Sequence, residues 1–134
     1  MIDHLSLPVS DYARSRAFYD KVLGALGYKV EMENTDSPEF VGAGYGNPGG
    51  PEPAFWMGAS RKPGPAPVPP EGQHVAFKAS SRAAVDAFHA AALAAGGRDN
   101  GAPGLRPRYH ANYYAAFVLD PDGHHLEAVC HRPG

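Results

Sequence analysis

Two stretches of this sequence decide the fold: HLSLPVSDYARSRAFYDKVLGALG at residues 4–27 and HVAFKASSRAAVDAFHAAALAAGG at residues 74–97. They align without a gap at a constant offset of 70 residues, which places His4 opposite His74. The other matched pairs are Ser10 with Ser80, Phe18 with Phe88, Leu23 with Leu93, and Gly27 with Gly97. Self-similarity at a fixed spacing indicates repeated supersecondary units. The sequence therefore predicts two related modules.

The first module, at about residues 1–59, is expected to begin with a strand from Ile2 to Val9. Ser10 or Asp11 can cap the following helix by accepting its free backbone N–H groups. Apolar residues recur every four positions along that helix, which we expect from Tyr12 to Leu26, with Gly27 as its stop. Three short strands are expected next, at Tyr28 to Glu33, Phe40 to Gly44 and Ala54 to Gly58.

The second module, at about residues 73–134, repeats this order after a linker of residues 60–72 that is rich in proline. A proline lacks the N–H that a strand ladder needs, so we expect an extended connector there. The elements expected in this module are a strand from Gln73 to Ala79, a helix from Arg82 to Ala95 capped by Ser80 or Ser81, a looser stretch from Arg98 to His110, and a hairpin of Tyr113 to Leu119 and Leu126 to His131. Its turn, Asp120-Pro121-Asp122-Gly123, has the residues that a β-turn prefers, and we interpret its acids as structural.

Length and composition limit the classes of protein to consider. The 134 residues fit a single domain, 1–134. Twelve Lys and Arg residues against fourteen Asp and Glu residues, with no basic cluster, make nucleic acid an unexpected partner. The sequence shows neither a secretory signal pattern nor a long apolar run, so a cytoplasmic protein without membrane contact is expected. Its single cysteine, Cys130, excludes an internal disulfide.

Strand alternation predicts which side chains share a face. Successive residues of a strand point to opposite sides, so the helices should cover the leucines of the first strand and leave His4 on the other side. The same reasoning leaves His74 and Glu127 uncovered in the second module. Two imidazoles and a carboxylate suit Fe, Mn, Ni, Co or Zn and keep coordination positions open. A single histidine on a strand is usually an ordinary hydrogen-bonded residue, so these residues alone leave metal binding open.

The segment from Arg106 to Tyr114 concentrates aromatic and basic side chains just before a strand that should line the site. Arg106 or Arg108 can pair with a carboxylate or phosphate of a small anion, and Tyr109, His110 or Tyr113 can donate hydrogen bonds to a chelating oxygen. The candidates for catalysis are thus Glu127 and His110. Candidate ligand contacts in the first module are Phe55, Trp56 and Met57, and of these we expect Phe55 and Met57 on the same side as Glu127.

These residues resemble the vicinal oxygen chelate superfamily, which includes glyoxalase I, extradiol dioxygenases, and fosfomycin and bleomycin resistance proteins. The likeness rests on the opening IDHLSLPVSDYARSRAFYDKVLGALGY, the strand of His74 and the closing DPDGHHLEAVCH. It implies an α+β fold in which two βαβββ modules form a cup-shaped mixed β-sheet site, with helices on the outer face. It also implies a homodimer and a small-molecule ligand, and His4, His74 and Glu127 match three of the family's metal-ligand positions.

One departure limits what the resemblance implies about the reaction. Glyoxalase I enzymes carry a fourth protein ligand on the last strand of the first module, where the offset of 70 places Met57. A thioether does not suit a hard divalent ion, and Glu52 would require a shifted register. Two hypotheses therefore stay open: a metal-dependent lyase or dioxygenase acting on a molecule with vicinal oxygens, and a metal-free protein that sequesters a small molecule, as in bleomycin resistance.

Overall fold

The computed structural model describes residues 1–50 and 52–134. Strands and helices follow one another in the order βαβββ, and this order occurs twice. The elements are β1 (Leu5–Pro8), α1 (Tyr12–Gly24), β2 (Lys29–Asn34), β3 (Phe40–Gly46) and β4 (Phe55–Ser60), followed by β5 (His74–Lys78), α2 (Arg82–Ala94), β6 (Arg98–Leu105), β7 (Tyr114–Leu119) and β8 (His125–Cys130).

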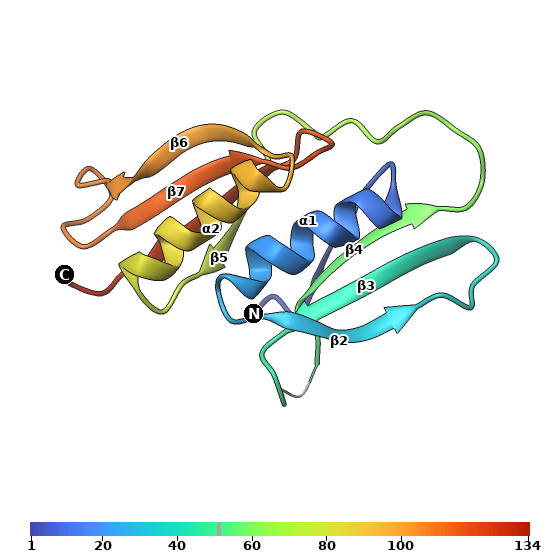
Figure 1. Cartoon of the computed structure of the whole chain (residues 1–134), viewed down its shortest axis with the longest axis horizontal. Helices are drawn as coiled ribbons and strands as arrows, with labels where there is room; N and C mark the ends of the chain where they lie inside the picture. Colours follow the sequence, from blue (N-terminus) through green and yellow to red (C-terminus); the bar gives the residue numbers. More distant parts are fainter. Residues whose placement is uncertain (51) are drawn as a thin grey trace.

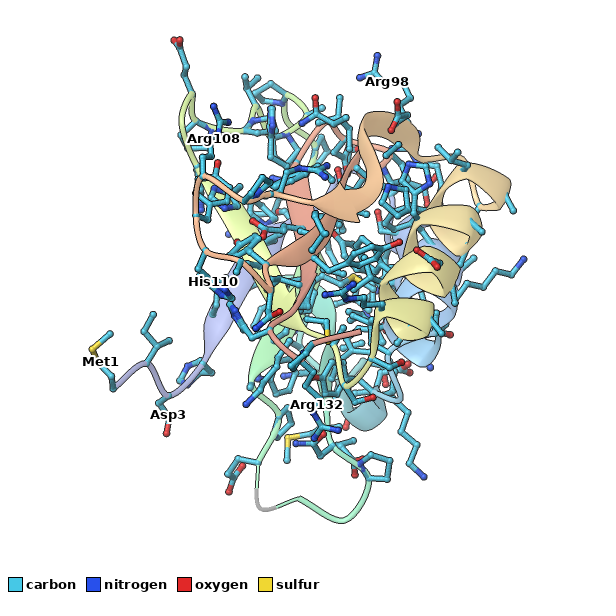
Figure 2. All side chains as sticks on the ribbon, turned by 90° about the vertical axis from the view of Figure 1, so that its left-hand side faces the viewer. Met1, Asp3, Arg98, Arg108, His110 and Arg132 are labelled. Atoms are coloured by element: carbon cyan, nitrogen blue, oxygen red, sulfur yellow. The ribbon has the colours of Figure 1, made fainter. Side chains whose placement is uncertain are left out.

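Each module forms its own four-stranded mixed sheet, in the orders β1-β4-β3-β2 and β5-β8-β7-β6. The first strand of each module runs parallel to the last, and the other neighbours are antiparallel. The sheets lie side by side, with α1 and α2 next to each other in front of them (Figure 1). Seen from the side, the helices form a layer on one side of the strands, and Met1 and Asp3 project on the other (Figure 2). The predicted α+β fold of two βαβββ modules is confirmed.

Both helices begin where the sequence predicts. The Asp11 carboxylate accepts a hydrogen bond from the Arg14 N–H at 3.0 Å, and the Ser81 hydroxyl accepts one from the Ala84 N–H at 3.1 Å. Such caps satisfy N–H groups that have no partner within the helix. Gly27, at φ 86°, follows the end of α1. None of the helices in the described part of the chain is long and apolar enough to span a bilayer.

The stretch from Arg98 to His110 departs from the prediction. Most of it forms the strand β6, which pairs with β7 through two register shifts. Gly101, one of the residues at these shifts, has φ 149° and lies against the Phe117 ring. Irregular pairing of this kind interrupts the alternation of apolar and polar residues that identifies a strand in a sequence. Glycine and proline, which are uncommon inside strands, make this strand harder still to predict.

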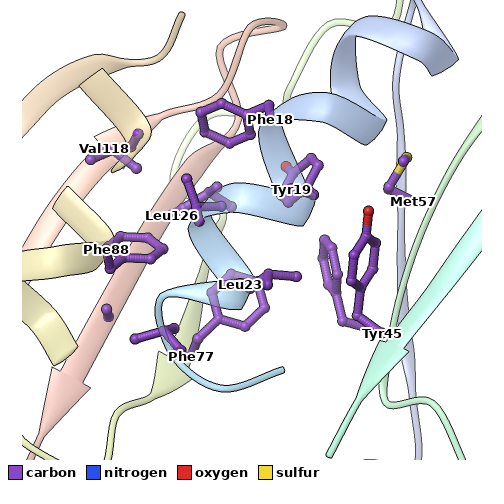
Figure 3. Packing of buried hydrophobic residues seen from close by; sticks show 14 of the residues in the cluster. Phe18, Tyr19, Leu23, Tyr45, Met57, Phe77, Phe88, Val118 and Leu126 are labelled. Atoms are coloured by element: carbon purple, nitrogen blue, oxygen red, sulfur yellow. The ribbon is translucent and has the colours of Figure 1, made fainter. Parts of the chain in front are cut away.

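A single hydrophobic core joins the two modules on the helix side of the sheets. Phe18, Tyr19 and Leu23 of α1 lie between residues of both sheets (Figure 3). Phe55 of β4 meets Phe77 of β5 edge-on, with ring centroids 5.0 Å apart. Neither module therefore buries its apolar face alone.

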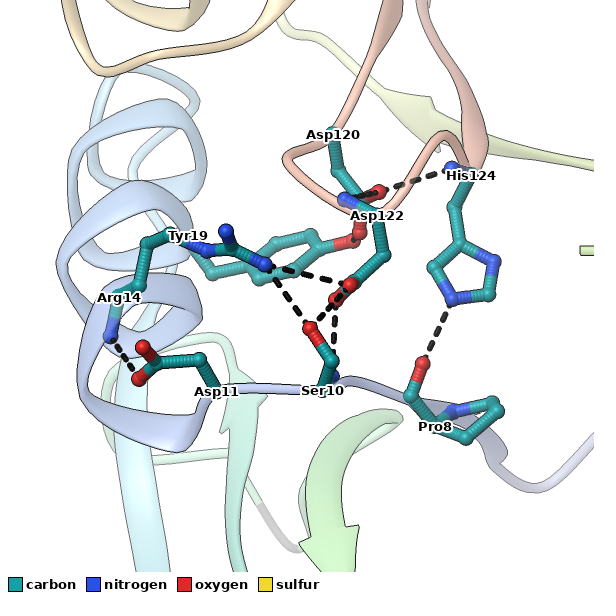
Figure 4. Close-up of polar contacts among 8 residues, drawn as sticks. All are labelled: Pro8, Ser10, Asp11, Arg14, Tyr19, Asp120, Asp122 and His124. Atoms are coloured by element: carbon teal, nitrogen blue, oxygen red, sulfur yellow. Dashed lines mark hydrogen bonds and ion pairs between the residues drawn. The ribbon is translucent and has the colours of Figure 1, made fainter. Parts of the chain in front are cut away.

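A buried carboxylate also ties the β7–β8 turn to the first module (Figure 4). Asp120 is 1% exposed and accepts a hydrogen bond from the Tyr19 hydroxyl at 2.6 Å. It also accepts the backbone N–H groups of Asp122 at 2.9 Å and His124 at 2.8 Å. Burial and the Asp120 carboxylate raise the pKa of Tyr19 well above its ordinary value, so Tyr19 remains a hydrogen-bond donor.

The neighbouring residues of this turn extend the connection. The Asp122 carboxylate accepts from the backbone N–H of Ser10 at 3.0 Å, from its hydroxyl at 2.5 Å, and from Arg14 at 3.2 Å. Nε2 of His124 donates to the Pro8 carbonyl at 2.6 Å, because a carbonyl oxygen can only accept. The acids of the turn are thus structural, as the sequence predicts.

We expect Tyr19→Phe to lower the free energy of unfolding by about 1–3 kcal/mol, because Asp120 would lose a donor while remaining buried. Urea denaturation followed by circular dichroism measures this. Tyr12→Phe is the matched control, since the Tyr12 hydroxyl donates to the exposed Glu33 at 3.0 Å and its loss should cost no more than about 0.5 kcal/mol. Equal losses in the two variants would contradict the role given to Asp120.

Candidate functional site

The register of the second sheet determines which side chains point away from the helices. Ala76 of β5 lies beside Glu127 of β8, and Phe77 lies beside Ala128. Phe77 and Ala128 belong to the core, so alternation turns His74 and Glu127 to the open face, the side of the sheet opposite the helices. This is the face expected from the sequence.

Glu127 is a buried carboxylate on this open face. It is 2% exposed, and its Oε1 lies 3.1 Å from Nε2 of His74. The Tyr113 hydroxyl donates a short hydrogen bond to its Oε2. Among the described residues, no lysine or arginine lies within ion-pair distance of Glu127. A buried carboxylate that pairs with no lysine or arginine is costly, and buried carboxylates of this kind are often metal ligands.

Tyr113 responds to this carboxylate. Burial raises its pKa, and the hydrogen bond and negative charge of Glu127 raise it further, to about 12. Tyr113 therefore holds its proton at neutral pH and fixes one oxygen of Glu127. Oε1 is left for His74 or for a ligand.

His110 and His131 form a hydrogen-bonded pair beside Tyr113. Nε2 of His110 lies 2.8 Å from Nδ1 of His131, and the two rings are stacked with centroids 5.0 Å apart. The backbone N–H of Asn112 points at Nδ1 of His110 at 3.1 Å. An N–H can only donate, so this Nδ1 is an acceptor and neutral His110 carries its proton on Nε2. His110 is thus the donor to His131.

The two remaining candidates of this segment border the same cluster. The Tyr109 ring is half-exposed and lies 4.9 Å from the Tyr113 ring. The guanidinium of Arg106 lies over the Phe117 ring at 5.4 Å and donates to the Ala102 carbonyl at 2.8 Å. The predicted residues of the second module therefore gather on one face.

His4 lies on the other sheet. Its Nδ1 is 2.6 Å from the Asp3 carboxylate, and its side chain is 57% exposed. It borders a trough of about 1080 Å³ on the open face of β1–β4, whose other lining residues include Ser6, Phe40, Gly42, Trp56 and Gly58. Among the described residues, no three His, Cys, Asp or Glu side chains lie close enough together to hold one ion. The structure thus brings His74 and Glu127 together but leaves His4 apart from them.

Phe55 and Met57 do not share the face of Glu127, which corrects the expectation from the sequence. They pair with Leu5 and Leu7 and belong to the core, at 5% and 1% exposure. Trp56, half-buried beside Ser6, lies on the opposite face of β4 from these two side chains and lines the trough.

The cause of this difference is one additional residue in the second module. Ser6 pairs with Trp56 and its counterpart Ala76 pairs with Glu127, so the offset of 70 in the first strands becomes 71 in the last. A shift of one residue exchanges the two faces of a strand. Trp56 is therefore the counterpart of Glu127.

The sequence interpretation missed the trough residues Phe40, Gly42 and Gly58. The signal was present in FVGAGYG at residues 40–46, where glycines alternate with larger residues. Glycine inside a strand often marks the close approach of another group.

Comparison with known proteins places this geometry in a family. A sequence model described as Glyoxalase/Bleomycin resistance protein/Dioxygenase superfamily matches residues 1–128. The chain belongs to this superfamily. A glyoxalase/bleomycin resistance protein from Albidiferax ferrireducens T118 is 31% identical, with a TM-score of 0.77 over 96% of this chain and 97% of that one. No curated protein matches the sequence.

More distant structures share the superfamily's fold. A glyoxylase/bleomycin resistance protein/dioxygenase domain from Frankia sp. EAN1pec is 20% identical, with a TM-score of 0.74 and 98% of both chains covered. A glyoxalase I mutant from Zea mays is 23% identical, with a TM-score of 0.71 over 96% of this chain and 46% of that one. At these identities the likeness concerns the fold alone.

We expect Glu127→Gln to lower the pKa of Tyr113 from about 12 toward its ordinary value of 10.0, because the negative charge that opposes ionisation is removed. Titration of carbon-13-labelled tyrosine rings by NMR measures this, with Tyr113→Phe to assign the resonance. Asp86→Asn is the matched control, since the Tyr114 hydroxyl donates to Asp86 at 2.7 Å and Asp86 raises the pKa of Tyr114. Each variant should shift only its own tyrosine, and an unchanged Tyr113 in Glu127→Gln would contradict the coupling.

Proposed function

We propose that the protein binds a divalent metal ion and acts on a small molecule with neighbouring oxygen atoms. The ligands are His74 and Glu127 of one copy together with His4 of a second copy. The observation that carries this proposal is the buried Glu127 carboxylate, which faces the open side of its sheet with His74 beside it.

The donor atoms suit such an ion. Imidazole nitrogen and carboxylate oxygen are common ligands of Fe, Mn, Ni, Co and Zn. Ligand atoms bonded to one ion at about 2.0–2.2 Å lie roughly 3 Å apart. The 3.1 Å between Nε2 of His74 and Oε1 of Glu127 has this size. A cation between them would also neutralise the buried carboxylate.

The third ligand is proposed to come from a second copy because one chain does not assemble it. His4 follows residues that project from the open side of the sheets (Figure 2), where Ile2 is 76% exposed. Exposed apolar residues at such a position favour burial against another chain. A symmetric homodimer would form two equivalent sites, each combining the first module of one copy with the second module of the other.

The residues around the ligands are assigned distinct roles. A bound ion would polarise substrate oxygens and stabilise negative charge that develops on them. Tyr113 orients Glu127 through its hydrogen bond, as partners of metal ligands commonly do. The hydrogen bond from Nε2 of His110 to Nδ1 of His131 holds both rings beside Tyr113, and His110 is the residue proposed to exchange a proton with the substrate. Arg106 and Tyr109, which lie beside this cluster, are proposed to contact the substrate.

A second candidate is metal-free binding of a small molecule. The trough favours it, because a cavity of about 1080 Å³ lined by the half-buried Trp56 ring can bind a small molecule without an ion. The two candidates differ in one measurable respect. Ligand effects that persist after chelation favour sequestration, and effects that require metal favour catalysis at the ion.

Calorimetric titration with Zn²⁺, Mn²⁺ and Ni²⁺ should show one site per chain in protein first treated with a chelator. Glu127→Gln and His74→Ala should each weaken binding at least tenfold, which is about 1.4 kcal/mol or more. His89→Ala is the control. Nε2 of His89 lies 2.9 Å from the Asp99 carboxylate, and neither residue is a proposed metal ligand. Unchanged affinity in both ligand variants would reject the metal site.

Mixing two defective variants tests the assembly of the site from two copies. His4→Ala and Glu127→Ala should each bind metal poorly alone. After they are unfolded together and refolded at a one-to-one ratio, about a quarter of the sites should recover tight binding, because half of the dimers are mixed and one of their two sites is intact. No recovery, with dimers present, would contradict a shared site.

A further inference from the structure

The open face of the first sheet carries little side-chain volume along its centre. Gly42 of β3 pairs with Gly58 of β4, and both line the trough. One step along the same face, Gly44 pairs with Trp56. One step in the other direction, Phe40 pairs with Ser60 and is 46% exposed. The floor of the trough is therefore backbone between two aromatic side chains.

The Trp56 ring occupies the space that a side chain at Gly44 would fill. A Cβ atom at residue 44 would lie 2.7 Å from Cε2 and 2.8 Å from Cζ2 of the indole, and 2.8 Å from Cβ of Pro53. The indole thus lies over the backbone of β3, where any side chain would displace it. An aromatic ring fixed before a ligand arrives loses little conformational freedom on binding.

Close strand packing explains part of the glycine pattern. A Cβ atom at Gly58 would lie 2.9 Å from the Val41 carbonyl oxygen, so the backbone alone requires glycine there. Gly44 differs, since two of its three nearest atoms belong to the indole. The glycine at residue 44 therefore leaves room for the indole of Trp56.

The dimensions suit a flat ring. Phe40 and Gly44 are four residues apart on β3, which corresponds to about 13 Å along a strand. An aromatic ring that stacks on the indole can extend over Gly42 and Gly58 toward Phe40. A puckered ring would meet the same floor with fewer contacts, and offset stacking contributes beyond the area that is buried.

We propose that the trough binds the planar aromatic part of the ligand, stacked on Trp56 and lying over the glycine floor. This inference rests on the proposed function only in assigning the trough to the same ligand. It specifies the ligand class as one with a flat ring. The oxygen atoms that meet the ion would belong to another part of the same molecule.

The test compares 2-naphthol with decahydro-2-naphthol, which has the same carbon skeleton but is not flat. Trp56 is the only tryptophan, so its indole N–H resonance reports on the trough directly. In chelated protein, 2-naphthol should move this resonance upfield and bind at least roughly fivefold more tightly than its saturated counterpart. Equal affinities, or an indole resonance that neither compound moves, would overturn the inference. Because metal is absent, this outcome is separate from the fate of the metal site.

Two variants locate the effect. Gly44→Ala should shift the indole resonance of the free protein and weaken 2-naphthol binding, whereas Gly24→Ala should change neither, because a Cβ at residue 24 meets nothing within 4 Å. If Gly44→Ala does not fold, Trp56→Leu provides the same comparison by calorimetry and should lose the preference for the flat compound. A preference that survives in Trp56→Leu would contradict stacking on this residue.

Discussion

The arrangement of the two modules depends on the hydrogen bonds that the buried carboxylate of Asp120 accepts. This carboxylate belongs to a turn of the second module, yet one of its donors is Tyr19 in the helix of the first. Ser10 and Pro8, at the end of β1, are held by the same turn. Because these contacts and the shared core fix one sheet beside the other, the helices cover one side and both open faces remain on the opposite side.

Much of this fold is written locally in the sequence. The repeat at an offset of 70 predicts both modules, and the caps Asp11 and Ser81 lie where the free N–H groups require them. The alternation of His74 and Phe77 gives the correct faces, since it depends on one strand only. Properties that depend on neighbouring residues in the chain were predictable for this reason.

Properties that depend on the exact number of residues between distant strands were not predictable. One additional residue between β5 and β8 exchanges the faces of the last strands, so Met57 was assigned to the side where Trp56 lies. The spacing of His4 from the pair His74 and Glu127 depends on how whole sheets are oriented, which no local pattern records. The strand β6 was missed because its register shifts disrupt alternation.

The equivalence of Trp56 and Glu127 has a consequence for how a ligand is oriented. Two halves of common design carry different groups at the same place, an indole in one and a carboxylate in the other. Each half has thus acquired its own chemical character despite the repeated architecture. Where the open face of a first module and the open face of a second module border one site, the two sheets are related in backbone but differ in their side chains. A ligand whose two ends differ chemically then binds in one orientation, and the reversed orientation is disfavoured.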